Sequence, residues 1–130
     1  MYKYVSFLII LSFNTVVFSQ PHIPTRAEDD SSYYIAVEVM PEPIGGIAAI
    51  QSHIYYPETA RKSNIEGKVY VLAYLNEKGS VDKTKILKGL GYGLDEAASK
   101  TVLKAKFTPG MQDGDPVKVE VVIPIVFILQ

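Results

Sequence analysis

The clearest alternating pattern in the chain lies at residues 67–75, which read GKVYVLAYL. Valine, alanine and leucine occupy one face of the predicted strand, and tyrosine and leucine occupy the other. A strand that is apolar on both faces is typical of the centre of a sheet. Residues 76–79 form a polar turn that ends in glycine, so the lysine-rich residues 80–88 are predicted to return beside this strand as a hairpin.

Helical spacing follows in three places. Apolar residues recur every three or four positions over residues 94–105, with acids in the first turn and lysines at the end, as a helix dipole favours. A short helix is predicted over residues 47–53, and another over residues 57–63, because proline suits the first position of a helix. Asn64 is a residue that tolerates the left-handed conformation, so it is predicted to end the second helix.

Two more stretches alternate at strand spacing. Residues 33–40 are predicted as a short strand that the prolines after it stop. Residues 117–129 are predicted as one long apolar strand that contains Pro124. Proline cannot donate a ladder hydrogen bond, so this last strand is predicted to lie at the edge of a sheet. An apolar edge either risks aggregation or pairs with another strand as a binding device.

These elements predict an α+β fold. Its sheet is small and antiparallel, with three strands or four, and two to three short helices pack on one face. The domain is predicted to occupy residues 35–130. Residues 1–19 read as a secretory signal peptide, with a membrane anchor as the alternative, and residues 20–34 read as a flexible acidic leader. Export to the periplasm follows from the signal peptide, and nucleic-acid partners do not fit an exported chain.

The composition restricts the chemistry. The chain has 130 residues, a formal net charge of −1 and no cysteine, which excludes disulfides and thiolate metal sites. The two histidines, His22 and His53, have no carboxylate or second histidine at ligand spacing. No serine lies in a nucleophile-elbow pattern, and the glycines of residues 89–93 do not match a phosphate-binding loop. We therefore predict no metal, no cofactor and no enzymatic activity.

An ordered series of short motifs resembles the C-terminal domain family of TonB proteins. The motifs are Pro43 with Gly45-Gly46, Tyr56-Pro57-x-x-Ala60, Ile65-Glu66-Gly67-Lys68-Val69, Gly79-x-Val81, Leu94-Asp95-x-Ala97, Phe107-x-Pro109-Gly110, and Gly114-x-Pro116-Val117 through Val122-Ile123-Pro124-Ile125-x-Phe127. No single motif is specific, and the resemblance rests on their order. The motif residues to which we assign a structural role are Tyr56, Pro57, Gly67, Phe107, Pro109 and Pro124.

The resemblance implies a function as well as a fold. In such proteins the last strand pairs with a short peptide, the TonB box of an outer-membrane transporter, and an inner-membrane proton motor supplies the force for energy-coupled transport. Physically this is strand addition, in which main-chain hydrogen bonds hold the peptide and alternating side chains select it. The residues that the resemblance assigns to this edge are Val117, Lys118, Val119, Glu120, Val121, Val122 and Ile123.

Two departures from the family pattern leave an alternative open. Residues 4–18 contain no histidine that could engage a motor, and the leader at residues 20–34 is short for a periplasmic arm. The alternative is an untethered interaction or structural domain that dimerises through its edge strand without transducing energy. A further expectation is that residues 33–40 lie on the same edge as an internal placeholder and lower the affinity for peptide.

Overall fold

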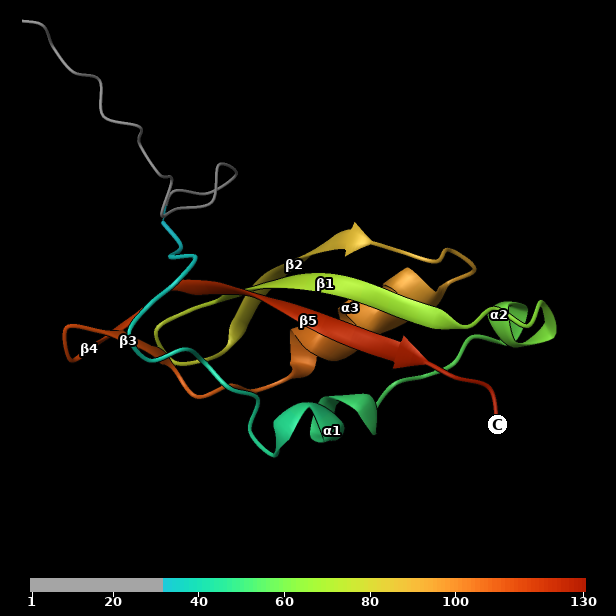
Figure 1. Cartoon of the computed structure of the whole chain (residues 1–130), viewed down its shortest axis with the longest axis horizontal. Helices are drawn as coiled ribbons and strands as arrows, with labels where there is room; N and C mark the ends of the chain where they lie inside the picture. The colour runs from blue at the N-terminus through green and yellow to red at the C-terminus, as the bar shows by residue number, and fades with distance from the viewer. Residues whose placement is uncertain (1–31) are drawn as a thin grey trace, which may run out of the picture.

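An antiparallel sheet of three strands forms the centre of the structure (Figure 1). Its order is β2 (Val81–Lys88), β1 (Gly67–Leu75) and β5 (Val119–Phe127), so the predicted central strand is confirmed with its bounds. The computed structural model describes residues 32–130. The predicted signal peptide and residues 20–31 of the predicted leader lie outside the described residues.

The central strand is paired along its whole length. Its pairs with β5 run without interruption from Gly67↔Phe127 to Leu75↔Val119, whereas its pairing with β2 has two irregularities. Val69, Val71 and Ala73 on one face of β1 are 0% exposed. This face packs against the helices and forms the main core, as the apolar pattern predicted.

Helix α3 (Leu94–Lys104) lies behind the sheet in Figure 1 and contributes the largest helical part of the core. Leu94, Ala98 and Val102 lie on one stripe of the helix and are 0% exposed. Asp95 and Glu96 in the first turn and Lys104 in the last complement the helix dipole. The helix predicted over residues 94–105 is therefore confirmed.

The two other helices are short. Helix α1 spans Gly46–Gln51 and helix α2 spans Glu58–Lys62, each slightly shorter than predicted. Each buries a single side chain, Ile50 in α1 and Ala60 in α2. Asn64 follows α2 with φ of 53°, which confirms the predicted left-handed residue at its end.

The strand predicted at residues 33–40 is wrong. Two isolated bridges replace it, Tyr34 with Val119 and Val39 with Met111. The two bridges contact different sheets, because Met111 belongs to strand β3 (Gly110–Gln112) of a second, two-stranded sheet. The segment crosses from one sheet to the other, and its apolar alternation is left largely in solvent, with Val39 54% exposed.

The single long strand predicted at residues 117–129 is also wrong in its bounds. It is divided into β4 (Asp115–Val117), which pairs with β3, and β5, which pairs with β1. Lys118 lies between the two strands, at the point where the chain changes sheets. Alternation alone cannot detect this division, because the side chains keep alternating through residue 118 while the pairing partner changes.

Candidate functional site

One long edge of the main sheet belongs to β5. The strand pairs with β1 on one side, and among residues 32–130 no strand runs along its other side. Backbone groups of an antiparallel strand point to the two sides alternately. Val126 exchanges both of its backbone hydrogen bonds with a side chain away from β1, which places residues 120, 122, 124 and 126 on the outward side.

Pro124 therefore sits where a missing N–H costs the sheet nothing. It lies opposite Tyr70 of β1, in a pair that does not exchange hydrogen bonds. The prediction from Pro124 that the last strand forms an edge is confirmed. Val122, two residues earlier, presents both its N–H and its C=O to the same side, and its side chain is 50% exposed.

The structure does not keep the seven residues of the predicted peptide-binding edge together. Val117 belongs to β4 and pairs with Gly110 in the second sheet. Val119, Val121 and Ile123 direct their backbone groups to β1. The outward side of this stretch thus consists of Lys118, Glu120 and Val122.

Both ends of this edge are occupied by the chain itself. At the start, Tyr34 N–H donates to the carbonyl of Lys118 at 2.8 Å, and Glu120 N–H donates to the carbonyl of Tyr34 at 2.9 Å. At the end, the side-chain amide of Gln51 in α1 donates to the Val126 carbonyl and accepts from the Val126 N–H at 3.1 Å. The Gln51 amide thus takes the place of a neighbouring peptide unit.

Tyr33 covers the face of the sheet opposite the helices. Its ring is 4% exposed and packs against Leu72 and Tyr74 of β1, which are 9% and 3% exposed. Aromatic side chains thus cover part of the second face of β1. Tyr33 and Tyr34, which the sequence assigned to the leader, are therefore packed against the domain.

The motif residues serve the fold at separate places. Phe107 is 2% exposed and lies in the core, Pro57 precedes α2, and Gly67 has φ of 147° with Leu90 against the position of a Cβ atom. Pro109 is partly buried in the segment that leads into β3. Of the six motif residues, only Pro124 lies on the β5 edge, and the others do not converge on one surface.

Tyr56 fixes the end of the sheet near α2. Its ring packs edge-to-face on Phe127 with centroids 5.5 Å apart, and its hydroxyl donates to the carbonyl of Ile65. The Arg61 guanidinium lies over the same ring at 5.6 Å. Desolvation first, and Glu66 second, raise the pKa of Tyr56 above its ordinary 10.0, while Arg61 acts in the opposite direction.

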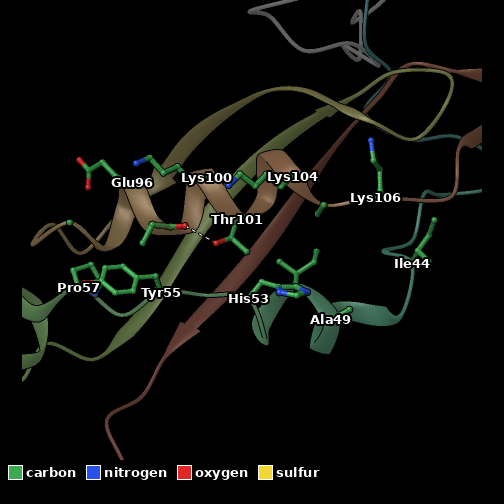
Figure 2. Close-up of a pocket in the computed structure, with 14 residues that line it drawn as sticks. Ile44, Ala49, His53, Tyr55, Pro57, Glu96, Lys100, Thr101, Lys104 and Lys106 are labelled. Atoms are coloured by element: carbon green, nitrogen blue, oxygen red, sulfur yellow. Dashed lines mark hydrogen bonds between the residues drawn. The ribbon is translucent and has the colours of Figure 1, made fainter.

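A groove lies between α1 and α3 on the helical side of the molecule (Figure 2). Its volume is about 870 Å³, and apolar side chains form most of its lining, with lysines along α3. His53 and Thr101 face it from opposite walls, but the Thr101 hydroxyl donates to the Ala97 carbonyl at 3.0 Å within its own helix. The groove thus presents no activated nucleophile.

Metal chemistry finds no support in the part of the chain that the structure describes. No group of three His, Cys, Asp or Glu side chains there could hold a metal ion. Within the same residues, no helix is both long and apolar enough to cross a membrane.

Comparison with known proteins identifies the family. Residues 52–129 match the family model described as the Gram-negative bacterial TonB protein C-terminal domain. The chain belongs to this family. The resemblance that the ordered motifs indicated is thereby confirmed.

A sequence relative and two solved structures accompany this match. Protein TonB of Vibrio cholerae is 35% identical over 113 residues, which cover 85% of this chain and 44% of that protein. The solution structure of the Pseudomonas aeruginosa TonB CTD is 24% identical with a TM-score of 0.49, covering 59% of this chain and 79% of that one. The Helicobacter pylori TonB-CTD is 29% identical with a TM-score of 0.46, covering 65% and 89%.

Of the residues at the two ends of the edge, Tyr34 lies in the segment that the sequence assigned to this edge, whereas Gln51 was not predicted. The predicted segment 33–40 reaches this edge only through Tyr34, with Tyr33 packed beside it, and not as a strand. Gln51 carried no signal at all, because a glutamine near the end of a short helix is normally solvated. Its role depends on where α1 is placed relative to β5, which is a property of the tertiary structure.

Proposed function

We propose that the chain binds an extended peptide by strand addition along the outward side of β5. The observation that carries the proposal is Val122, whose N–H and C=O lie on the outer side of an edge strand. A peptide strand placed there would exchange both hydrogen bonds with Val122 and donate to the carbonyl of Pro124. The proposed partner is the TonB box of an outer-membrane TonB-dependent transporter.

Family membership supports a wider role for the domain. We place the domain in the periplasm and link it to TonB-dependent, energy-coupled transport, in which inner-membrane proton-motor proteins are the other partners. The chain spans 44% of the length of its Vibrio cholerae relative. This domain accounts for the grip on the transporter rather than for the relay of force, and it acts without a cofactor or a chemical step.

Substitution at Val122 tests the backbone contribution directly. Val122→Pro removes the outward N–H but no hydrogen bond to β1, since this residue faces away from β1. Val122→Ala is the matched control, because it shortens the side chain and keeps the N–H. With a synthetic TonB-box peptide, we expect Val122→Pro to weaken binding about 10-fold, as the loss of about one hydrogen bond implies.

Calorimetric titration of both variants decides the outcome, with circular dichroism to show that both fold. The control should bind within about three-fold of the wild-type chain, since about 0.6 kcal/mol covers a small change in apolar contact. Equal affinities of Val122→Pro and Val122→Ala would show that the peptide does not pair with this backbone, and strand addition at β5 would be rejected.

A second candidate function uses the same edge. Two copies of the chain could pair their β5 strands and form a homodimer, and the exposed side chains of Val122 and Ile128, at 50% and 66%, favour this contact. Sedimentation velocity at micromolar concentration separates the candidates. A strict monomer eliminates the dimer. If the chain is a dimer and the TonB-box peptide dissociates it, the peptide and the second copy of the chain bind to the same edge.

A further inference from the structure

We infer that Tyr33 and Tyr34 form an internal latch that occupies the first part of the β5 edge and competes with an incoming peptide strand. This inference rests on the proposed function, because the competition matters only if β5 accepts a peptide. It adds to that function a regulation that is built into the domain.

The backbone of Tyr34 makes the hydrogen bonds that a bound strand would make. It donates to Lys118 and accepts from Glu120, in a parallel bridge with Val119 between them. Lys118 and Glu120 are two of the three outward-facing residues in the predicted binding stretch. A peptide that pairs along this whole stretch must therefore displace Tyr34.

The side chain of Tyr33 anchors the latch. Its ring meets the ring of Tyr74 edge-to-face, with centroids 5.0 Å apart and an interplanar angle of 72°. Its hydroxyl donates to the Asp82 carboxylate of β2 at 2.8 Å. These contacts join the segment to both β1 and β2, and so they hold the Tyr34 backbone in register beside β5.

Two lysines complete the anchor. Lys118 Nζ lies 5.5 Å from the centroid of the Tyr33 ring, and Lys83 Nζ lies 5.8 Å from it and 4.6 Å from the centroid of Tyr74. Ammonium groups at this distance attract the face of an aromatic ring. Lys118 therefore holds the segment twice, through its carbonyl to Tyr34 and through its side chain to Tyr33.

The latch and Gln51 together define a short window. Between the residues that they engage, Glu120 and Val126, the outward-facing residues are Val122 and Pro124. A short peptide can pair in this window while the latch stays closed. A longer strand binds only when the latch opens, and its apparent affinity is reduced by the fraction of molecules that are open.

Tyr33→Ala in the full chain removes the anchor, and Tyr55→Ala is the matched control because Tyr55 is 69% exposed. Amide hydrogen exchange without peptide reports the latch itself. We expect the Glu120 amide to exchange more slowly than the Val122 amide in the wild-type chain, and as fast as the Val122 amide in Tyr33→Ala. If the Glu120 amide is no slower than that of Val122 in the wild-type chain, the latch is absent.

Affinity for a synthetic TonB-box peptide that is long enough to pair from Lys118 to Pro124 then reports the competition. With the open form at about a tenth of the population, Tyr33→Ala should bind about 10-fold more tightly, and Tyr55→Ala should bind as the wild type does. Equal binding by all three chains overturns the latch alone. Failure of all three chains to bind overturns the proposed function and therefore the competition. In that case the exchange of the Glu120 amide still reports whether Tyr34 pairs with β5.

A measurement on the wild-type chain covers the case in which Tyr33→Ala does not fold. At saturating peptide the Tyr34 amide should lose its protection, because its acceptor on Lys118 is taken by the peptide. The Glu120 amide should stay protected through its new partner. Continued protection of the Tyr34 amide at saturation contradicts displacement.

Discussion

Gly79→Ala should destabilise the domain more than a glycine-to-alanine substitution at any other turn glycine with positive φ. Gly79 has φ of 80°, and a Cβ atom there would lie 1.9 Å from the carbonyl oxygen of Phe107. The hairpin turn before β2 lies directly against the chain that leaves α3, and Phe107 N–H donates to the Gly79 carbonyl at 2.9 Å. The added methyl group must push these segments apart.

The cost has two parts that the structure separates. A left-handed alanine costs about 1–2 kcal/mol. The displacement would also break the hydrogen bond from Phe107, a core residue, which adds about 1 kcal/mol before any loss of packing. The sum of about 2–3 kcal/mol is a large fraction of the roughly 5–15 kcal/mol that stabilises a typical domain.

Gly114→Ala is the matched control. Gly114 has the same φ of 80°, but nothing lies within 4 Å of its Cβ position, so only the conformational cost applies. Thermal unfolding followed by circular dichroism should show a fall in Tm of about 8–24 °C for Gly79→Ala and about 4–16 °C for Gly114→Ala, with the larger fall for Gly79→Ala. Equal losses for the two variants would refute the close approach between the turn and Phe107.

Two further predictions concern the edge and its surroundings. Pro124→Val adds an outward N–H to β5. The TonB-box peptide should therefore bind more tightly in calorimetry, or the chain should self-associate in sedimentation. If the variant shows no increase in either peptide binding or self-association, residue 124 does not face outward. Tyr56 has a raised pKa, so its neutral form favours folding, and its contribution is full below pH 10.0 and lost as the pH rises through the folded pKa. Tyr56→Phe should therefore flatten the decline in unfolding free energy above about pH 10, as measured by urea denaturation, and an unchanged decline would assign it to other groups.

The sequence predicted the parts of the fold that depend on local pattern. The two-sided apolar run of β1 predicts a central strand, the apolar stripe of α3 predicts a helix packed on the core, and the proline in β5 predicts an edge strand. Each of these predictions is confirmed. The errors lie where pairing changes without a change in alternation. The division between Val117 and Val119 is of this kind, because a strand that leaves one sheet for another keeps its side-chain period.

The candidate site was predictable only in part. Pro124 indicated the edge, and alternation gives Val122 the same outward direction, but no local pattern specifies the register that places Val122 opposite Leu72. The residues that occupy the two ends of the edge depend on tertiary contacts as well. Tyr34 lies 85 positions before Val119, with which it pairs in β5. Gln51 lies in helix α1 and bonds to Val126 of β5.

Amide exchange along β5 with and without a TonB-box peptide tests the central claim most directly. The amides of Val121 and Ile123 bond to β1 and should be slow in both states, whereas the Val122 amide should be fast alone and slow with peptide. This alternation is the signature of a strand added to the outer edge. Protection of Val122 without any ligand, or peptide-induced changes confined to the groove between α1 and α3, would contradict the account.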